Sequence, residues 1–525
     1  MNPTNPLVNA MFTDLYQITM VYAHWKNKRH KDPAVFELFF RKHPFQGEYT
    51  IFAGLDECLK YTQTFKFAEE DIEYLQTKVP ALSHCDAGFF DYLRELDGSE
   101  LQIYALKEGS LAFPKVPLAS IVGPLGIAQL IETAFLNLIN FPSLVATNAC
   151  RMVVAARSRG GSYDSKQKPI LAEFGLRRAQ GPDGGMTATK YSVLGGFDAT
   201  SNVLAGQLFS VPIIGTNAHA YVQAYHSLEE VQHLQLSTNS NCGPSPNLNV
   251  PFQHINILSQ VSKYRRQLSN EDPLFASTNN GELASFISYA VAFPDSFACI
   301  VDTYDTIQSG LRNFILVSFV LDDLGYIPKG IRLDSGDLAS LSFQASTLCS
   351  KLFQQYKNRT FLNQLSIIAS NDLNETALHE LNTKPHSINI YGIGTNLVTC
   401  QEQPALGCVY KLVQLNHIPR MKLSNEMEKI LIPGYKIPYR LYDKHDRPII
   451  DLLTCEKDAD ENALPTKGKR ILCRHPFQSQ QRIYVTPSRV DKLHHLVFDK
   501  KNGLIIPPMD LLQTRQVSYS CFYSC

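Results

Sequence analysis

The chain has 525 residues, and its 49 Lys and Arg residues balance its 49 Asp and Glu residues, so the formal charge is zero at pH 7. This balance excludes a protein built around a general nucleic-acid surface or a polybasic membrane anchor. Hydrophobic residues make up 44% and charged residues 19% of the chain, which excludes a disordered protein and predicts two or three domains with buried cores.

No feature of the sequence directs the chain to secretion or to a membrane. The first residues, MNPTNPLVNAMFTDLYQ, contain neither the basic n-region nor the apolar h-region of a signal peptide. No apolar run approaches the roughly 20 residues that a membrane-spanning helix needs. The 12 cysteines are scattered, without a C-x-x-C pair or the histidine spacing of a zinc site. We therefore expect reduced thiols and a cytoplasmic protein.

Residues 1–145 mix two kinds of pattern. Aromatic, strand-like stretches such as AVFELFFRK (34–42) and YTIFAG (49–54) alternate with helical ones. A long helix is expected at about 125–157 and would lead into the next part of the chain. We predict that 1–145 forms an N-terminal α/β domain with a helical linker.

Residues 146–404 alternate short apolar runs with stretches of helical period. This alternation is typical of parallel β-α-β units, so we expect a barrel or a doubly wound sheet. The stretch 236–251 is rich in Asn, Ser and Pro and predicts a loop, while Asn371 or Asp372 is expected to cap a helix. The six strand-like runs are KPILAEFG (168–175), FSVPIIGTNAHA (209–220), FACIVDT (297–303), KGIRLDSGD (329–337), LSIIAS (365–370) and SINIYGIGTN (387–396).

Residues 405–525 return to strand-like segments, such as CVYKLVQL (408–415) and RPIIDLLT (447–454). We predict that this C-terminal segment packs with the N-terminal domain and that the two ends flank the central α/β block.

Polar side chains follow each of the six strand-like runs. In parallel sheets and barrels, ligands bind at the carboxyl ends of the strands. Packing alone does not explain polar residues at every strand end, so we expect the functional site there. The residues concerned are Glu173, Arg177, Arg178, Thr216, His219, Asp302, Arg332, Asp334, Asp337, Ser370, Asn371, Asp372, Gly392, Gly394 and Thr395.

The segment IRLDSGDL contains Arg332 and two carboxylates, Asp334 and Asp337, around a Ser-Gly turn. Carboxylates at this spacing suit Mg²⁺ or sugar hydroxyls, and the arginine suits a carboxylate or phosphate. The alternative is a strand-end turn in which an aspartate caps the following helix.

Two glycine-containing turns are further candidates. YGIGTN carries Gly392 and Gly394 after an apolar strand, where backbone N–H groups can hold a phosphate. GTNAHA places His219 at the start of a helical run, where a histidine can serve as an acid, a base or a phosphoryl acceptor. Most single histidines have none of these roles.

The remaining candidates are a pair of arginines and an N-terminal aromatic residue. Arg177 and Arg178 suit an anion with several oxygens, such as pyrophosphate, or form one surface salt bridge and one solvated side chain. Asp14 and Tyr16 lie near aromatic residues, where Tyr16 either stacks on a flat heterocycle or belongs to the core.

Taken together, these motifs closely resemble nicotinate phosphoribosyltransferase, a type II phosphoribosyltransferase family. The resemblance covers residues 7–510, in family order. The matching strings are TDLYQ (13–17), INFPSLVATNACR (139–151), EFGLRRAQGPDGG (173–185), GGFDATSNVLAG (195–206), GTNAHA (215–220), VDTYDT (301–306), IRLDSGDL (331–338), YGIGTNLVT (391–399) and GCVYKLV (407–413).

The resemblance implies a fold and an activity. The fold is an incomplete TIM-like α/β barrel with an additional α/β domain built from the N- and C-terminal segments. The implied activity is ATP-assisted synthesis of nicotinate mononucleotide and pyrophosphate from nicotinate and phosphoribosyl pyrophosphate, the first step of NAD biosynthesis from nicotinate. The working unit is a homodimer whose active site is shared between subunits, with Mg²⁺ or Mn²⁺ as the metal.

The resemblance also implies roles for individual residues. His219 is the histidine that ATP transiently phosphorylates, and Arg332 and Asp334 complete the catalytic set. One departure is Ala220, where the family usually has serine. The nicotinate site comprises Tyr16, Thr216, Arg332 and Asp14, with Tyr16 coming from the second subunit. The metal site is assigned to Asp334 and Asp337. The phosphoribosyl pyrophosphate site comprises Arg177, Arg178, Ser335, Gly336, Asn371, Gly392, Gly394 and Thr395.

Two alternatives to this function remain at the level of sequence. One is a nicotinamide or quinolinate phosphoribosyltransferase, which would share the barrel but not the acceptor. Quinolinate has a second carboxylate and should require a more basic pocket than Arg332 alone provides. The other is a non-catalytic binding protein derived from the barrel, against which the intact His219, Arg332, Asp334 and Asp337 argue.

Overall fold

The computed structural model describes residues 3–158, 168–239, 254–426, 429–455, 464–478, 480–499, 501–505 and 510–524. The chain divides into two compact units, each of which is described by itself. Unit 1 comprises 1–150, 180–196 and 399–525, and unit 2 comprises 151–179 and 197–398.

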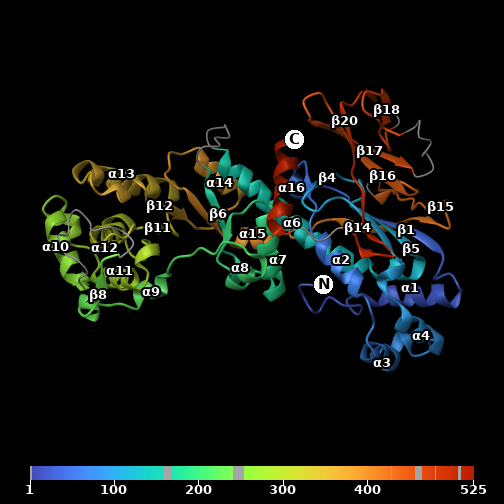
Figure 1. Cartoon of the computed structure of the whole chain (residues 1–525), viewed down its shortest axis with the longest axis horizontal. Helices are drawn as coiled ribbons and strands as arrows, with labels where there is room; N and C mark the ends of the chain where they lie inside the picture. Colours follow the sequence, from blue (N-terminus) through green and yellow to red (C-terminus); the bar gives the residue numbers. More distant parts are fainter. Residues whose placement is uncertain are drawn as a thin grey trace. The chain divides into compact units, whose positions relative to one another are not determined.

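Unit 1 is built around a seven-stranded antiparallel sheet to which both ends of the chain contribute. Its strand order is β15-β14-β1-β5-β3-β21-β22, and Figure 1 shows the blue N-terminal strands beside the orange and red C-terminal ones. The two ends of the chain meet where β1 pairs with β14, with Ala34 opposite Leu415. The strands are β1 (Pro33–Phe40), β3 (Gln102–Ala105), β5 (Ala119–Pro124), β14 (Cys408–Leu415), β15 (Ile418–Pro419), β21 (His495–Asp499) and β22 (Gly503–Leu504).

Smaller sheets and the helices complete unit 1. The smaller sheets contain β2 (Thr50–Ile51), β4 (Leu111–Ala112), β16 (Lys436–Tyr442), β17 (Pro448–Cys455), β18 (Ile471–Arg474), β19 (Arg482–Val485) and β20 (Arg489–Lys492). The helices are α1 (Leu15–Lys26), α2 (Leu55–Thr64), α3 (Glu69–Lys78), α4 (Ala87–Glu95), α5 (Leu125–Leu130), α7 (Gly181–Leu194) and α16 (Leu511–Ser524), together with most of α6 (Glu132–Arg157).

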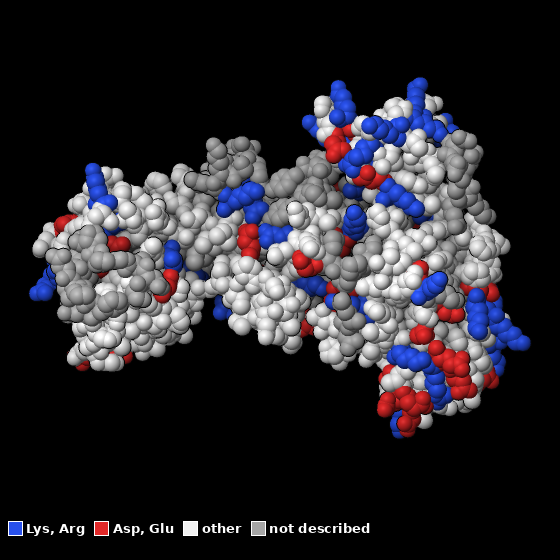
Figure 2. Space-filling view, viewed as in Figure 1, with Lys and Arg blue, Asp and Glu red and all other residues white. Residues whose placement is uncertain are grey.

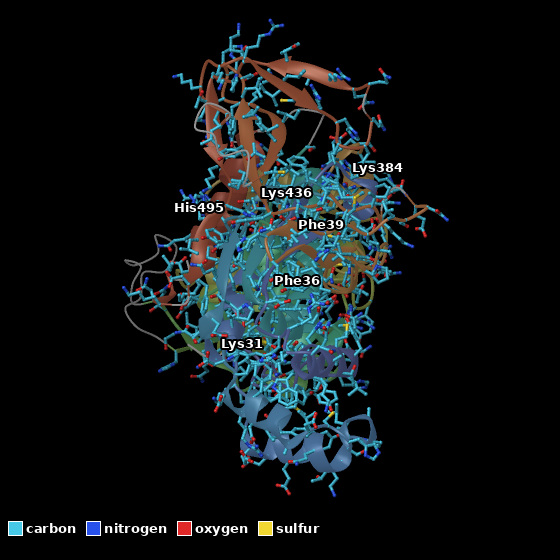
Figure 3. All side chains as sticks on the ribbon, turned by 90° about the vertical axis from the view of Figure 1, so that its right-hand side faces the viewer. Lys31, Phe36, Phe39, Lys384, Lys436 and His495 are labelled. Carbon is cyan, nitrogen blue, oxygen red and sulfur yellow. The ribbon has the colours of Figure 1, made fainter. Side chains whose placement is uncertain are left out.

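Strand β1 shows why the sheet lies inside unit 1. Its sequence, PAVFELFF, is nearly all apolar, and every residue after Pro33 is buried, as expected for a strand covered on both faces. Phe36 stacks on Tyr410 with 5.0 Å between ring centroids (Figure 3). The exception is Glu37, whose carboxylate lies 2.8 Å from the Lys436 ammonium. Burial raises the pKa of Glu37 to about 7, although Lys436 opposes the shift.

Helix α6 corrects the expectation that no segment is long and apolar enough to span a membrane. It is the one helix among the described residues that meets both conditions, but 72% of its apolar window is buried inside the fold. Its hydroxyl groups hold strand β2 and the segment beside it, since the Ile51 N–H donates to Thr147 Oγ1 at 2.9 Å and the Ala53 N–H to Ser143 Oγ at 3.0 Å. In this fold α6 packs as a core helix.

Unit 2 contains a six-stranded parallel sheet with helices between its strands. Five of the six predicted strand-like runs form strands of this sheet, which has the order β10-β11-β12-β13-β6-β7. The prediction of parallel β-α-β units is therefore confirmed. The strands are β6 (Ile170–Glu173), β7 (Ala199–Thr200), β10 (Ala298–Ile300), β11 (Gly330–Leu333), β12 (Ser366–Ala369) and β13 (Ile390–Ile393), and a separate hairpin holds β8 (Gln235–Ser237) and β9 (His254–Asn256).

Helices cover the parallel sheet, and α12 lies deepest. Every residue of α12 from Leu311 to Leu321 is buried, because its sequence LRNFILVSFVL is apolar on nearly all sides. The helices of unit 2 are α8 (Val203–Phe209), α9 (His219–Gln223), α10 (Ile257–Ser269), α11 (Asn280–Ala292), α12 (Leu311–Asp323), α13 (Leu338–Gln355), α14 (Glu375–Asn382) and α15 (Thr395–Thr399).

The segment 212–217 connects the two edges of the parallel sheet. At one edge, the Thr200 N–H donates to Pro212 O and the Ile214 N–H donates to Thr200 O, both at 3.0 Å. At the other edge, the Ile300 N–H of β10 donates to Asn217 Oδ1 at 2.9 Å. Both edge strands therefore bond to one short segment.

Three local predictions were wrong. The run 209–220 forms one bridge, Thr200 with Ile213, instead of a strand, because Pro212 has no N–H for a ladder. The helix expected at 125–157 is two helices, α5 and α6. Helix α14 is capped by Asn374, whose side chain accepts the Ala377 N–H at 2.8 Å, rather than by Asn371 or Asp372. Most of the loop predicted at 236–251 lies outside the described residues.

Candidate active site

The carboxyl ends of the parallel strands surround a cavity of about 520 Å³ in unit 2. Because parallel strands end at the same edge of a sheet, side chains from distant parts of the chain meet there. The cavity is lined by Phe174, Leu176, Arg177, Ser201, Gly215, Thr216, Ala218, His219, Ile300, Arg332 and Asp334. All of these residues belong to unit 2.

Arg332, in strand β11, is held in one orientation at the cavity wall. Its Nε–H donates to Ser370 Oγ at 2.8 Å, one Nη2–H to Asp334 Oδ1 at 2.9 Å, and one Nη1–H to Thr216 Oγ1 at 3.4 Å. The ring of Phe174 lies 5.9 Å from the guanidinium carbon. Three of the five N–H donors of a guanidinium are thus used, which leaves a pair for a ligand.

Asp334 is fixed by the strands on both sides of it. Its backbone N–H donates to Asp302 Oδ2 at 2.7 Å, and its Oδ1 accepts the Ser370 hydroxyl at 2.6 Å. The Ser335 hydroxyl donates to the same Asp302 oxygen at 2.6 Å. Asp302 therefore holds the turn that follows strand β11, and that turn orients Asp334.

His219 begins the short helix α9 and is more exposed than Asp334 or Arg332. Its side chain is 39% exposed, against 23% for Asp334 and 15% for Arg332. Nδ1 lies 3.1 Å from the Thr303 hydroxyl. Nε2 lies 3.6 Å from Asp334 Oδ2, beyond the length of a hydrogen bond. In the tautomer in which Nδ1 carries the proton and donates it to Thr303, Nε2 is unprotonated and its lone pair lies on the side of Asp334.

The carboxylates at the cavity fit a magnesium ion that is held mainly by a substrate. The described residues contain no group of three His, Cys, Asp or Glu side chains that could hold a metal alone. Asp302 Oδ1, however, is buried and has no hydrogen-bond partner among these residues. Mg²⁺ commonly takes one or two carboxylates and fills its shell with water and phosphate oxygens. One free carboxylate oxygen beside Asp334 matches that pattern.

Comparison with known proteins decides the family. Residues 11–140 match the nicotinate phosphoribosyltransferase (NAPRTase) N-terminal domain, 170–429 the nicotinate phosphoribosyltransferase (NAPRTase) family, and 435–520 the C-terminal domain. The chain is 46% identical to the nicotinate phosphoribosyltransferase of Dictyostelium discoideum over 514 residues, or 97% of this chain and 82% of the relative. It is 47% identical to nicotinate phosphoribosyltransferase 2 of Arabidopsis thaliana over 492 residues, or 94% and 84% of the two chains. The chain belongs to the nicotinate phosphoribosyltransferase family.

A solved structure supports the same assignment. The crystal structure of human nicotinic acid phosphoribosyltransferase superposes with a TM-score of 0.83 at 36% identity, covering 98% of this chain and 94% of the human one. The resemblance inferred from motifs is thereby confirmed for the family, and so is its mixed α/β fold with a parallel sheet.

The cavity contains five of the residues assigned from the family resemblance. Thr216, His219, Arg332, Asp334 and Arg177 all line it. Arg178, Ser335 and Gly336 lie next to lining residues in the sequence but are not part of the lining. Gly336 has φ +76°, a left-handed conformation that allows the Ser-Gly turn after Asp334.

The glycine turn after strand β13 lies beside the cavity wall. A Cβ on Gly392 would approach the Phe174 ring to 2.4 Å, and one on Gly394 would lie 3.1 Å from Phe174 O. Neither glycine nor Thr395 belongs to the lining. Asn371 is exposed in the loop after strand β12.

Two assigned carboxylates and one aromatic residue have other surroundings. Asp337 caps helix α13, its Oδ1 accepting the Ser340 N–H at 3.2 Å, which is the capping alternative named for this motif. Asp14 and Tyr16 lie in unit 1, at the start of α1, where Asp14 accepts the Thr133 hydroxyl at 2.9 Å. Tyr16 is 49% exposed, and partial burial, with Glu132 and Asp14, raises the pKa of its phenol.

The assignments omitted four residues that build the site. Asp302 and Ser370 were noted as strand-end residues but given no role, and they hold Asp334 and Arg332. Phe174 and Thr303 were not considered. Phe174 directly follows strand β6 and Thr303 lies in the loop after strand β10, which was the available signal, but only the fold reveals which groups they contact.

Proposed function

We propose that the unit 2 cavity carries out the reaction of the nicotinate phosphoribosyltransferase family, with the division of roles given below. The chain is a phosphoribosyltransferase that acts on nicotinate and phosphoribosyl pyrophosphate in NAD biosynthesis. The products are nicotinate mononucleotide and pyrophosphate. This assignment rests on one observation, which is that Arg332, Asp334 and His219 line the same cavity.

The chemistry requires little covalent work from the protein. The sugar loses pyrophosphate from C1 through an oxocarbenium-like state, and the pyridine nitrogen of nicotinate attacks that carbon. The protein must neutralise the departing pyrophosphate and hold the flat nucleophile in line. Arg177 at the cavity and Arg178 beside it supply positive charge for the first task, and neither forms an ion pair within the described residues.

Arg332 holds the nicotinate carboxylate in this proposal. Its two remaining N–H donors match the two oxygens of a carboxylate, and Ser370, Asp334 and Thr216 fix their direction. Nicotinamide offers no negative charge to the guanidinium, and a charged hydrogen bond contributes roughly 1.5–3 kcal/mol. The clamp therefore favours nicotinate over nicotinamide. Tyr16 of the second subunit stacks on the ring, and Asp14 lies beside it.

His219 accepts a phosphoryl group from ATP. Thr303 holds Nδ1, so Nε2 forms the new P–N bond while the bond between the β–γ bridging oxygen and the γ-phosphorus breaks and ADP departs. Hydrolysis of the phosphohistidine later returns the enzyme to its starting state. The added negative charge lies beside the pyrophosphate subsite, and this links ATP hydrolysis to the equilibrium of the transfer.

A divalent metal, Mg²⁺ or Mn²⁺, neutralises pyrophosphate charge when bound. The free Oδ1 of Asp302 and the carboxylate of Asp334 are the groups that would contact it. Asp337, assigned earlier to the metal, caps a helix. Ser335, Gly336, Asn371, Gly392, Gly394 and Thr395 stay predictions for the phosphoribosyl pyrophosphate subsite.

Two structural features support the finer predictions on fold and assembly. The segment 212–217, which bonds to both edge strands, supports an incomplete barrel. Exposed apolar side chains next to the cavity support a homodimer, because a monomer rarely leaves such residues adjacent. They are Val203 (68% exposed), Leu204 (53%), Leu208 (55%) and Ile213 (51%). We further propose that the chain is cytoplasmic.

Direct assay tests the reaction. The enzyme is mixed with phosphoribosyl pyrophosphate, Mg²⁺ and ATP, and with nicotinate, nicotinamide or quinolinate as acceptor, and pyrophosphate is measured. We expect the highest kcat/KM with nicotinate. Faster turnover of either other acceptor contradicts the choice of substrate, and no pyrophosphate with any acceptor favours a non-catalytic binding protein.

The His219→Ala variant tests the phosphoryl step. We expect loss of ATP hydrolysis and of the acid-labile phosphoenzyme formed from γ-labelled ATP, while slow, uncoupled transfer remains. His233→Ala changes an exposed histidine of the same unit and serves as the control. Undiminished labelling of His219→Ala contradicts the assignment.

Mixing two variants that each lose ATP-coupled transfer tests the shared site. If Tyr16 of one subunit completes the cavity of the other, equal amounts of Tyr16→Ala and His219→Ala chains regain activity after exchange, to about one intact site in four. The control uses two chains that both carry His219→Ala. Recovery no greater than the sum of the separate variants contradicts the sharing of the site.

A further inference from the structure

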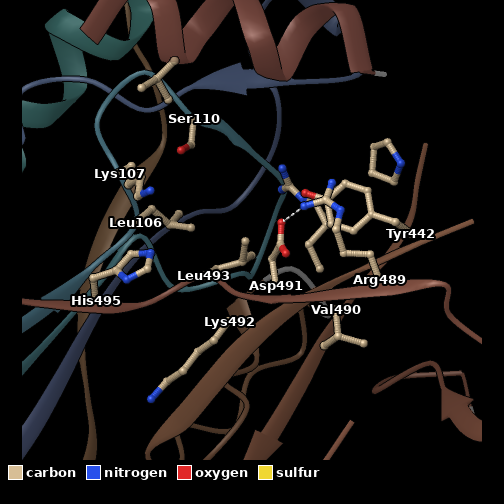
Figure 4. A pocket seen from close by; sticks show the side chains of 13 residues that line it. Leu106, Lys107, Ser110, Tyr442, Arg489, Val490, Asp491, Lys492, Leu493 and His495 are labelled. Carbon is tan, nitrogen blue, oxygen red and sulfur yellow. Dashed lines mark hydrogen bonds and ion pairs between the residues drawn. The ribbon is translucent and has the colours of Figure 1, made fainter. Parts of the chain in front are cut away.

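Unit 1 contains a second cavity, of about 670 Å³, far larger than a single ion requires (Figure 4). Its volume lies within the range of small-molecule sites. Its lining comes from both ends of the chain: the turn after strand β3, strands β16 and β20, the start of β21, and helix α16. It has no residue in common with the unit 2 cavity.

One wall of this cavity consists of arginines that are already neutralised. Arg440 is buried, and its Nε–H and Nη2–H donate to the two carboxylate oxygens of Asp451 at 2.7 and 2.8 Å. Arg489 lies 3.5 Å above the ring of Tyr442. It also forms ion pairs with Asp446 and Asp491. These groups make a rigid wall and provide little charge for a ligand.

The opposite wall is positive and has no carboxylate to balance it. Lys107 and Lys492 are exposed, and no ion pair of either lysine occurs within the described residues. Figure 4 shows His495 and Ser110 on the same side as Lys107. Burial lowers the pKa of His495, and the charges of Lys107 and Lys492 lower it further. The same charges attract an anion to this wall.

The turn that carries Lys107 and Ser110 is fixed in place. The Ser110 N–H donates to Lys107 O at 3.1 Å and closes the turn. Gly109 has φ +87°, and a Cβ there would lie 2.7 Å from Thr514 O of helix α16. Only glycine therefore fits, and α16 holds the turn against movement. A ligand would meet a preorganised pair of polar groups, which lowers the entropy cost of binding.

The floor between the two walls is apolar. Leu106 and Leu493 lie there in Figure 4, and Val490 and Val517 complete the apolar part of the lining. A bare inorganic anion would leave this surface uncovered. An organic group attached to the anion would remove it from water, at roughly 25 cal/mol per Å² of apolar surface.

We propose that this cavity binds a small organic phosphate of nucleotide size, at a site separate from the active site. The phosphate contacts Lys107, Ser110 and His495, and the organic part covers Leu106 and Leu493. Phosphate fits better than a single carboxylate, because a phosphate dianion offers three acceptor oxygens to Lys107, Ser110 and His495 and carries a second charge that Lys107 and Lys492 attract. Figure 2 shows Lys and Arg side chains gathered over the C-terminal strands of unit 1, which favours the approach of anions.

Calorimetric titration of the full chain with ADP tests the site. The double variant Lys107→Ala/Lys492→Ala removes the unbalanced charges, and we expect it to lose roughly tenfold or more in ADP affinity at one site. Lys444→Ala, an exposed lysine outside the lining, is the matched control and should bind like the unaltered chain. The lysine-dependent binding should persist in Arg332→Ala, because that residue belongs to the other cavity.

Two further ligands separate the parts of the proposal. Adenosine lacks the phosphate and inorganic phosphate lacks the organic part, so each should bind at least tenfold more weakly than ADP at the lysine-dependent site. Adenosine binding as tightly as ADP overturns the role of the phosphate, and inorganic phosphate binding as tightly overturns the organic ligand. Unchanged ADP affinity in the double lysine variant overturns the site itself.

Discussion

The two units use charged side chains in opposite ways. In unit 1, the Lys190 ammonium lies 2.9 Å from Glu57 and 3.4 Å from Asp56, and burial hides most of this cluster. In unit 2, Arg332, Asp334 and His219 also contact one another or nearby polar groups, but they line a cavity. Side-chain exposure rises from 14% at Lys190 to 39% at His219.

This difference shows that charge pairing alone does not identify a functional site. A buried cluster of paired charges is closed to a ligand, and breaking one of its pairs destabilises the fold. Arg332 differs because its three hydrogen bonds orient the guanidinium at the cavity and still leave two N–H groups without a hydrogen bond within the described residues. Changes in the unit 1 cluster should therefore affect stability, and changes in the unit 2 cluster should affect turnover.

The largest effect is expected for Lys190→Ala. Removing the ammonium leaves Glu57 and Asp56 buried with Lys60 as the positive charge that still pairs with both, and breaking a buried pair costs about 3–5 kcal/mol. Urea denaturation measures the loss as a shift of the midpoint. The control is Lys429→Ala, which removes an exposed pair with Glu426 and should cost less than about 1 kcal/mol. Equal losses in both variants would remove the distinction between buried and exposed pairs.

The next effect is a pH dependence that belongs to unit 1. Burial lowers the pKa of His494 to about 4, and its Nε2–H donates to Pro117 O at 2.8 Å. An unfolded histidine titrates near 6.5, so the unfolded state binds the proton first as the pH falls. Stability is therefore full above pH 6.5 and falls by about 3 kcal/mol as the pH falls towards 4.

Denaturation midpoints measured from pH 7 to pH 4 check this prediction. His494→Gln keeps an N–H donor but does not titrate, so its stability should change less with pH than that of the unaltered chain. Equal slopes in the two proteins would assign the pH dependence to other groups.

Arg332→Ala should affect binding and leave stability nearly unchanged. Loss of the clamp costs roughly 1.5–3 kcal/mol, which raises the KM for nicotinate by about ten- to more than a hundredfold. The KM for phosphoribosyl pyrophosphate should change much less. Arg332→Lys keeps the charge without the fork and should recover only part of the loss. Equal changes in both KM values would contradict the clamp.

The smallest effect is expected for Ser370→Ala. Its hydroxyl accepts the Arg332 Nε–H and donates to Asp334, so its loss loosens the clamp without removing it. A hydrogen bond of this kind contributes about 0.5–1.5 kcal/mol, and the KM for nicotinate should rise a few-fold. Ser340→Ala, at an exposed position of helix α13, is the control. No difference between these variants would show that Asp334 and Thr216 orient Arg332 without Ser370.

The sequence predicted five of the six parallel strands because each is a short apolar run followed by polar residues; the two-residue strand β7 is too short to give such a pattern. It predicted Arg332, Asp334 and His219 because they follow those runs in recognisable motifs. The prediction of a strand at 209–220 was wrong because this run is as apolar as the true strands. Pro212 prevents a ladder there, and the segment 212–217 instead bonds to both edge strands of the parallel sheet. Hydropathy does not distinguish these outcomes.

The roles of single polar residues depended on three-dimensional contacts. Asp337 and Asp334 share one motif, yet Asp337 caps α13 and Asp334 faces the cavity. Asp302 holds the turn after a strand some 30 residues away in the chain. No local sequence pattern indicates a contact between residues so far apart in the chain. The contact forms because the register of strands β10 and β11 places Ile300 beside Arg332, so that the residues after the two strands lie together.

The segment 212–217 makes the position of His219 depend on both edges of the parallel sheet. It bonds to strands β7 and β10 at once, carries Thr216, and leads within two residues to His219. If this segment separated from either edge strand, His219 would move away from Asp334 while the remaining strands stay paired. Warming should therefore inactivate the enzyme at a lower temperature than the one at which its secondary structure melts.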